Sequence, residues 1–309
     1  MSTLLISHPA CLDHLTPPGH PERPDRLRAV ERALEAEKFQ MLARVEAPLA
    51  PFEIVALCHP MDYITELRDA TPEQGMVRLD ADTSMSPGSF EAALRAAGGG
   101  IRGVDEVLGK KAANAFVATR PPGHHAETAR PMGFCLFDNA AIAARYAQNH
   151  HGIDRAAIVD FDVHHGNGSQ EIFWADKTVM YCSTHQMPLF PGTGAIGERG
   201  DYDTVVNAPL RPGDGAEAFR SAFEGRILPR LSEFGPELII ISAGFDAHMR
   251  DPLANINLDE DDFAWATRKI MEVADRHAGG RIVSLLEGGY DLQALGNSVA
   301  AHVTALMRG

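Results

Sequence analysis

The sequence has few cysteines, and their positions suggest neither a disulfide framework nor a thiolate zinc site. The four cysteines, Cys11, Cys58, Cys135 and Cys182, are scattered over 309 residues and include no Cys-x-x-Cys pair. Paired spacings are expected for either kind of site. Free thiols are typical of a reducing compartment, so we predict a cytoplasmic protein.

The sequence is also poor in basic residues and in long apolar runs. Its 28 Lys and Arg residues against 42 Asp and Glu residues give a formal net charge of −14. An acidic surface repels phosphate backbones, which argues against a nucleic-acid-binding protein. No apolar run approaches the roughly 20 residues that span a bilayer, and the first residues lack the basic and apolar regions of a signal peptide. We therefore expect neither nucleic acid nor a membrane as a partner.

No segment of the sequence divides the chain into parts. It has no linker rich in Pro, Gly or Ser, no block of like charges and no repeat of fixed period. Apolar residues make up 45% and charged residues 23% of the sequence, as in ordinary globular proteins. We predict one domain over residues 1–309.

Short apolar runs alternate with longer segments of helical period. The predicted strands are 3–7, 115–119, 156–161, 179–183, 238–242 and 281–286, and the predicted helices are 24–37, 89–108, 139–149, 216–234, 259–277 and 292–307. Continuous apolar runs such as 238–241 are typical of parallel strands buried on both faces. The pattern predicts an α/β fold, a single three-layer domain with a mostly parallel central sheet flanked by helices. Asp259 is expected to cap the helix 259–277.

Polar residues gather directly after the predicted strands. They occupy 120–125, 162–168, 185–194, 244–252 and 287–291. Ligands of open α/β sheets bind at the carboxyl ends of the strands. These five segments are therefore predicted to converge on one crevice.

The segment after the strand 156–161 has the residue types of a catalytic metal site. Asp160, Asp162 and His164 occupy alternate positions, so in an extended chain their side chains point the same way. Asp162 and His164 are both good zinc ligands, and three protein ligands plus a water is the pattern of catalytic zinc. The alternative is a solvated polar loop with a core histidine. The cost of burying two Asp and two His residues without a cation favours the metal site.

The segment after the strand 115–119 contains two adjacent histidines, His124 and His125, which follow a Pro-Pro-Gly turn. Such a turn can bring both rings to one site, and imidazoles suit proton transfer because they titrate near neutral pH. The alternative is a surface pair without function, which is what we expect of His150 and His151 at the end of a helix. The position of His124 and His125 after a strand of the same sheet favours a catalytic role.

Two further segments supply a carboxylate and a phenol. Asp246, after the strand 238–242, is either a third metal ligand or a helix cap. Tyr290 follows Gly288 and Gly289, whose backbones permit close approach and positive φ. Its hydroxyl would stabilise an oxyanion, unless it is an ordinary rim or core tyrosine. Together with the histidine pair, these residues are the components of metal-assisted hydrolysis of an amide.

These motifs resemble those of the histone deacetylase family, in the arginase/deacetylase superfamily. The matching segments are 20–24, 120–126, 160–168, 190–194, 244–246 and 288–290, so the resemblance covers almost the whole chain. The chain is similar to bacterial members related to class II deacetylases, including acetoin-utilisation-like proteins and acetylpolyamine amidohydrolases. The resemblance implies that residues 1–309 form a single deacetylase-like catalytic domain.

The resemblance implies two cation sites. One Zn²⁺ per chain would be bound by Asp162, His164 and Asp246. A K⁺ site, also typical of the family, would be formed by the carbonyl groups of Asp160, Asp162 and His164 together with Ser183.

The resemblance also implies the roles of the catalytic residues. His125 matches the general base, and His124 matches its electrostatic or acid partner, with Asp160 behind it. Tyr290 matches the residue that polarises the acetyl carbonyl. Asn167 stands behind His125 where class I members carry Asp, so His125 is less strongly biased toward its charged form.

The residues matched to the acyl-lysine tunnel are Gly133, Phe134, Phe190, Leu253, Gly288 and Gly289. The two phenylalanines match its aromatic walls, and Leu253 matches its rim. Polyamine-selective relatives carry an acidic residue at that rim position, so we expect acyl-lysine to be preferred over acetylpolyamines. A loop acid such as Glu73 or Asp82 would reverse the preference if it reached the substrate.

We therefore predict zinc-dependent hydrolysis of an N-acetyl amide, with an acetylated lysine side chain as the substrate. An amidohydrolase acting on acetylpolyamines or other small acetylated amines is one alternative, and an inactive acyl-lysine reader or scaffold is another. A binuclear manganese ureohydrolase is disfavoured, because its DAHxD-type motif is not found. The sequence leaves open whether the chain forms homo-oligomers.

Overall fold

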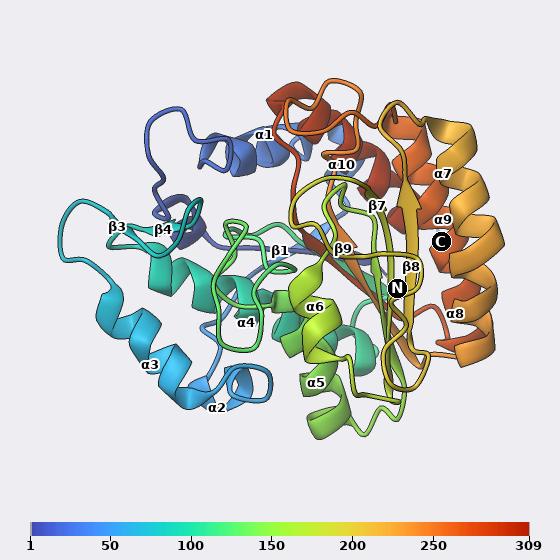
Figure 1. Ribbon diagram of the computed structural model, residues 1–309, viewed down its shortest axis with the longest axis horizontal. Helices are drawn as coiled ribbons and strands as arrows, with labels where there is room; N and C mark the ends of the chain where they lie inside the picture. The colour runs from blue at the N-terminus through green and yellow to red at the C-terminus, as the bar shows by residue number, and fades with distance from the viewer. Residues whose placement is uncertain (1, 309) are drawn as a thin grey trace.

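Eight parallel strands form the central sheet of the computed structural model, which describes residues 2–308 (Figure 1). Their order across the sheet is β2-β1-β5-β10-β9-β6-β7-β8. Their bounds are β1 Thr3–Ser7, β2 Ala43–Glu46, β5 Asn114–Val117, β6 Ala156–Asp160, β7 Val179–Gln186, β8 Val205–Leu210, β9 Leu238–Ala243 and β10 Ile282–Leu286. A short antiparallel hairpin of β3 (Val77–Arg78) and β4 (Ser84–Met85) lies outside this sheet. The predicted α/β class and the mostly parallel sheet are confirmed.

Helices cover both faces of the sheet. They are α1 Asp25–Ala33, α2 Phe52–Val55, α3 Met61–Ala70, α4 Ser89–Leu108, α5 Asn139–His151, α6 Asn167–Ile172, α7 Ala216–Ala222, α8 Leu228–Phe234, α9 Glu260–His277 and α10 Leu292–Met307. Figure 1 shows α7, α8 and α9 on one side of the sheet and α4 and α5 on the other. Alternate residues of β9 belong to two different hydrophobic cores. Ile239 and Ile241 lie in one core, and Leu238 and Ile240 lie in the other. This double burial explains the continuous apolar run of that strand.

All six predicted strands are present, and the two missed strands of the sheet, β2 and β8, are its edges. β2 is largely exposed and has the sequence Ala-Arg-Val-Glu, which carries no continuous apolar run. In β8, Asn207 and Pro209 interrupt the apolar residues. Proline is tolerated there because an edge strand leaves one row of backbone groups unpaired.

The predicted helices are present with two differences. The helix 24–37 was expected to be continuous, but α1 ends at Ala33, and the chain turns so that Leu34 and Phe39 are both buried. The helix 216–234 contains a π-helical segment, Phe223–Ile227, which ends two residues before Pro229, whose missing N–H disrupts the regular hydrogen-bond ladder. The cap at Asp259 is confirmed, with a reciprocal hydrogen-bonded box to Asp262.

The parallel direction of the strands places the ends of β5, β10, β9, β6 and β7 side by side at one edge. The segments that follow these strands are the five polar segments of the sequence, so their predicted convergence has a structural basis. Within residues 2–308, every helix is too short or too polar to span a bilayer.

Candidate functional site

Two carboxylates and an imidazole meet at this edge. Asp162 and His164 follow β6, and Asp246 follows β9, its neighbour in the sheet. One ligand atom of each lies within 4.8 Å of the others, and all three side chains are buried. His164 Nδ1 is 3.2 Å from Asp162 Oδ1 and 3.0 Å from Asp246 Oδ2. The three side chains thus present their polar atoms to one point.

The charges of this group suit a divalent cation. Burial and the neighbouring Asp162 carboxylate together raise the pKa of Asp246 to about 6. Burial opposes the charged form of His164, but Asp162 and Asp246 outweigh it and raise its pKa to about 10. Two buried carboxylates repel each other, and a divalent cation with oxygen and nitrogen ligands relieves that repulsion. The donor set therefore fits a zinc ion.

Glycines allow the loops to close around these carboxylates. A Cβ atom on Gly244 would lie 2.0 Å from Asp162 Oδ2, and one on Gly288 would lie 2.3 Å from Asp246 Oδ2. The Gly288 N–H donates to Asp162 Oδ2 at 2.8 Å, and the Val163 N–H donates to Asp246 Oδ1 at 2.9 Å. Backbone groups thus fix both carboxylates, and a Cβ atom at Gly244 or Gly288 would clash with them.

The reason that Asp160, Asp162 and His164 gather differs from the one expected. β6 ends at Asp160, and the chain bends after it, so the assumption of an extended chain through His164 was wrong. Asp160 Oδ1 accepts the Asp162 N–H at 3.1 Å, and Asp162 Oδ1 accepts the His164 N–H at 2.9 Å. Each carboxylate therefore closes a turn with the residue two positions on, and these turns aim the side chains.

His124 and His125 lie next to the three candidate ligands. Their ring centroids are 4.0 Å apart, and the centroid of His125 is 6.0 Å from that of His164. His124 Nδ1 is 3.0 Å from Asp160 Oδ2, whereas His125 Nδ1 is 2.9 Å from Asn167 Oδ1. The pair therefore stands between a carboxylate on one side and a neutral amide on the other.

These partners separate the pKa values of the two histidines. Burial disfavours the charged form of His124, but the carboxylates of Asp162 and Asp160 outweigh it and hold its pKa well above the ordinary value. Burial together with the charge of His124 holds the pKa of His125 well below it. The arrangement thus supplies one proton donor and one proton acceptor at neutral pH.

Tyr290 follows β10 and reaches the same edge. Gly289 has φ of 122°, which an L side chain rarely adopts, and its carbonyl accepts the Arg26 Nε–H at 2.7 Å. The Arg26 guanidinium lies 5.0 Å from the centroid of the Tyr290 ring. Burial raises the pKa of the Tyr290 hydroxyl well above its usual value, so the hydroxyl stays a hydrogen-bond donor at neutral pH.

Phe134 and Phe190 lie on different sides of the site. The Phe134 ring is 5.9 Å from that of Tyr290, and the Phe190 ring is 5.2 Å from that of His125. Phe134 has φ of 69°, an uncommon conformation for a residue other than glycine. Hydrogen bonds hold this segment in place, because Gly133 N–H donates to Asp82 Oδ1 and Phe134 N–H to Thr83 Oγ1, both at 3.1 Å.

The structure places the other sequence-predicted residues less centrally. Leu253 is half-buried, on the loop after Asp246. Ser183 lies opposite Asp160 in the register of β6 and β7, and its hydroxyl is 2.8 Å from His185 Nδ1. The K⁺ site built on these residues stays a prediction.

Sequence reasoning gave no role to a buried ion network behind Tyr290. Glu22 and Arg26, together with Arg120, are buried side chains with no measurable exposure. Glu22 accepts hydrogen bonds from Arg26 Nη1 at 3.1 Å and from Arg120 Nη2 at 2.7 Å. Glu22 and Arg120 lie in motifs that carry the family resemblance, whereas Arg26 follows the first of them, and no spacing rule predicts that residues 98 positions apart pair.

A second missed residue, Glu287, lies behind His124. Its carboxylate accepts the N–H groups of Gly123 and His124 at 2.7 and 3.3 Å and the Ser242 hydroxyl at 3.2 Å. Burial raises its pKa to about 8. A glutamate directly after the fully buried strand β10 is an unusual placement, and that is the signal by which the sequence could have revealed it.

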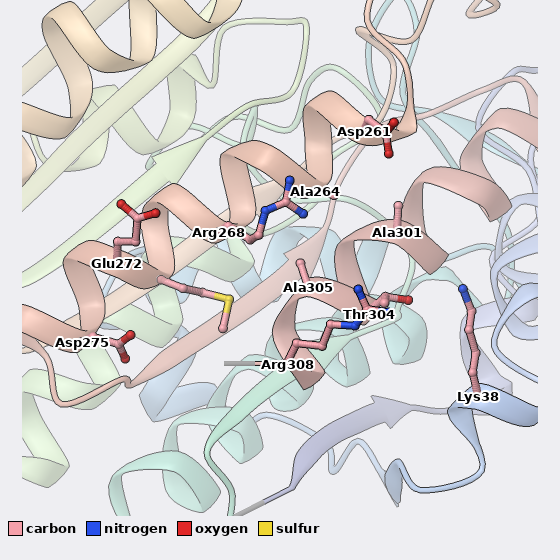
Figure 2. A pocket seen from close by; sticks show the side chains of 11 residues that line it. Lys38, Asp261, Ala264, Arg268, Glu272, Asp275, Ala301, Thr304, Ala305 and Arg308 are labelled. Atoms are coloured by element: carbon pink, nitrogen blue, oxygen red, sulfur yellow. The ribbon is translucent and has the colours of Figure 1, made fainter.

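A surface groove of about 410 Å³ lies between α9 and α10 and is separate from this site (Figure 2). Its lining includes Asp261, Arg268 and Glu272 of α9 and Thr304 of α10, with Lys38 across from them. None of the residues at the carboxyl edge of the sheet that are described above lines it.

Comparison with known proteins shows where this combination of fold and site occurs. The histone deacetylase domain family matches residues 20–306. Histone deacetylase 10, chloroplastic, of Oryza sativa subsp. japonica is 42% identical over 302 residues, which cover 91% of this chain and 68% of the rice protein. The histone deacetylase-like amidohydrolase of Pseudomonas aeruginosa is 40% identical over 277 residues, covering 88% and 73% of the two chains. The crystal structure of the HDA15 HD domain matches with a TM-score of 0.94 at 34% identity, covering 99% of this chain and 88% of that one.

Proposed function

Because the chain belongs to the histone deacetylase family, a family of hydrolases of acetyl amides, we propose that it is a zinc-dependent deacetylase of acetyl-lysine side chains. The whole of residues 1–309 is proposed to act as one catalytic domain. The observation that carries the proposal is the convergence of three buried metal-ligand side chains with a histidine pair of opposite pKa shifts.

The proposed zinc ligands are Asp162, His164 and Asp246, whose atoms lie within 4.8 Å of one another. A zinc ion held there would polarise the acetyl carbonyl oxygen and lower the pKa of a neighbouring water. Three protein ligands leave room for water and substrate, as catalytic sites require. Among residues 2–308, this trio is the one such group of metal-ligand side chains, which disfavours a two-metal ureohydrolase.

The histidine pair is proposed to move the protons. The contact of His125 Nδ1 with Asn167 Oδ1 places a proton on Nδ1, which leaves Nε2 free to accept a proton from the attacking water. His124, held in its charged form by Asp162 and Asp160, is positioned to stabilise the developing negative charge and to provide a proton for the leaving amine. These contacts support a proton-accepting role for His125 and a proton-donating role for His124.

Tyr290 is proposed to donate a hydrogen bond to the oxyanion that develops on the carbonyl oxygen. Its hydroxyl is protonated at neutral pH, and Gly288 lets the chain before it approach the carboxylates of Asp162 and Asp246 closely. Preorganised donors of this kind are among the largest contributions to catalysis.

The walls of the site favour a long aliphatic amine. Phe134 and Phe190 offer aromatic faces on either side, and Leu253 adds apolar surface without charge. Asp82, one of the acids that would attract a polyamine, accepts hydrogen bonds from the Gly133 N–H at 3.1 Å and the Thr83 hydroxyl at 2.9 Å. Both bonds fall on Oδ1 and tie this carboxylate to the segment around Phe134, so the proposed preference for acyl-lysine over acetylpolyamines rests on the uncharged rim at Leu253.

An assay of the metal-free and zinc-restored protein tests this function. We expect hydrolysis of an acetyl-lysine peptide to stop on chelation and to return with one equivalent of Zn²⁺ per chain. Hydrolysis that survives complete metal removal would contradict the proposal, and a metal-loaded protein that binds but never cleaves acyl-lysine would be a reader or scaffold. A cytoplasmic location stays a prediction, and the rice relative is named as chloroplastic.

A further inference from the structure

We propose that Asp251 is a positioning residue that holds Tyr290 and Leu253 in one arrangement, so that a single carboxylate links the oxyanion donor to the substrate rim. This inference rests on the function proposed above. Its basis is a pair of hydrogen bonds to Asp251, a residue that lies outside the matched motifs.

Each oxygen of the Asp251 carboxylate accepts one backbone N–H. Oδ2 accepts from Tyr290 at 2.7 Å, and Oδ1 accepts from Leu253 at 3.0 Å. The side chain is buried, with 7% exposure, so water does not compete strongly for these bonds. The two residues come from different loops, which follow β9 and β10, and the carboxylate bridges them.

The Asp251 bond is the contact that fixes the peptide N–H of Tyr290 itself, whereas the bonds from Asp162 and Arg26 hold the two glycines before it. Two glycines precede it, and Gly289 has φ of 122°, so the local chain supplies little stiffness. Arg26 holds the Gly289 carbonyl, and the Asp251 bond fixes the next peptide group. No side chain among residues 2–308 hydrogen-bonds the Tyr290 hydroxyl, so the backbone and ring contacts alone orient the hydroxyl.

The bridge also restrains the rim. Leu253 is half-buried and follows Pro252, and its N–H bond to Asp251 closes a turn two residues long. Both oxygens of the carboxylate accept backbone N–H groups, and with 7% exposure the side chain is directed into the protein and away from the solvent at the rim. Asp251 therefore acts on specificity through the place it gives to Leu253 and not through its own charge.

A second, outer bridge joins the same two loops and provides a matched control. Arg250 is half exposed, at 47%, and its guanidinium contacts Asp291 at 3.1 Å and Gln293 at 3.2 Å. These contacts reach neither Tyr290 nor Leu253. Exposed ion pairs contribute little, so Arg250→Gln is expected to leave kcat and KM unchanged.

Asp251→Asn tests the proposal, because an amide has one acceptor oxygen and must present N–H groups to the second donor. In the zinc-loaded enzyme, we expect kcat on an acetyl-lysine peptide to fall by roughly tenfold to a hundredfold, the usual cost of a small misplacement, with zinc content unchanged. KM is expected to rise as Leu253 is released. If Asp251→Asn does not fold, as judged by thermal unfolding, Asp251→Ser replaces it and is interpreted in the same way.

A double-mutant cycle with Tyr290→Phe separates positioning from general damage. If Asp251 acts through Tyr290, adding Asp251→Asn to Tyr290→Phe should lower kcat little further, while the rise in KM persists. The inference would be overturned if Asp251→Asn lowered kcat as much in the Tyr290→Phe background as in the parent enzyme. It would also be overturned if Asp251→Asn alone kept both kcat and KM within about twofold of the parent values. A parent enzyme that cleaves no acyl amide would instead refute the proposed function itself.

Discussion

His124 and His125 face each other with ring centroids 4.0 Å apart, yet their Nδ1 atoms have partners of different charge. His124 meets the Asp160 carboxylate at 3.0 Å, and His125 meets the Asn167 amide oxygen at 2.9 Å. Two adjacent imidazoles repel each other when both are charged, so protonation of one disfavours protonation of the other. The carboxylates of Asp162 and Asp160 keep His124 charged, and burial together with that charge keeps His125 neutral beside the Asn167 amide, which divides the pair into donor and acceptor.

Replacing that amide by a carboxylate tests the division. In Asn167→Asp, the new anion favours the charged form of His125 and raises its pKa. Because the base must be neutral to act, the acidic limb of the kcat/KM profile should move to higher pH, by about one unit or more. Asn149→Asp, at an exposed position on α5, is the control. An acidic limb that does not move would mean that His125 is not the base.

The proposed ligands are tested by metal content. Asp162→Ala removes a carboxylate that faces both His164 and the Gly288 N–H, so we expect the variant to lose zinc and activity together. The exposed Asp154→Ala serves as control and should keep both. Full zinc occupancy of Asp162→Ala, measured by elemental analysis, is incompatible with the assignment.

The hydroxyl of Tyr290 is tested by its removal. Tyr290→Phe keeps the ring next to Phe134 but loses the donor, so kcat should fall by about 10²–10³ while zinc content stays the same. Tyr202→Phe, which alters an exposed tyrosine, should behave as the parent enzyme. Near-normal turnover by Tyr290→Phe would assign the oxyanion contact to another group.

The buried network around Glu22 makes a prediction about stability. Glu22→Gln leaves Arg26 and Arg120 without their anion, which typically costs about 3–5 kcal/mol of unfolding free energy. Burial favours the neutral acid, but Arg120 outweighs it and holds the pKa of Glu22 well below its ordinary value.

The pH dependence of that loss has a definite sign. A depressed pKa stabilises the folded state above the unfolded pKa, which is about 4.3 for Glu, and this stabilisation is lost as the pH falls below it. The difference in unfolding free energy between the parent and Glu22→Gln should have its full value at pH 7 and should shrink below about pH 4. Denaturant titrations across this range measure it, with the exposed Glu35→Gln as control. A gap independent of pH would contradict the ionic origin.

Much of the sheet and its functional edge could be predicted from the sequence, because buried parallel strands carry continuous apolar runs that end in polar residues. The run 238–241 is one example of this pattern, and the run 156–159, with Asp160 and Asp162 directly after it, is another. The edge strand β2 could not be predicted, since its exposed Ala-Arg-Val-Glu sequence has no apolar run. Strand order was also beyond reach, because it depends on contacts between distant segments.

The supporting residues were harder to predict than the central ones. His124, Asp162 and Asp246 belong to residue types whose chemistry is visible in a motif. Glu287 and Asp251 act by accepting backbone N–H groups from other loops, and such bonds leave no periodic mark in the sequence. Only the folded chain shows which amides they meet.

Substrate choice by the zinc-loaded enzyme tests the central claim most directly. We would measure kcat/KM for an acetyl-lysine peptide, acetylputrescine and acetylspermidine under the same conditions. The apolar rim at Leu253 predicts preference for the peptide, by the roughly 5- to 150-fold that corresponds to a missing charge contact of about 1–3 kcal/mol. Acetylpolyamines favoured tenfold or more would contradict the account.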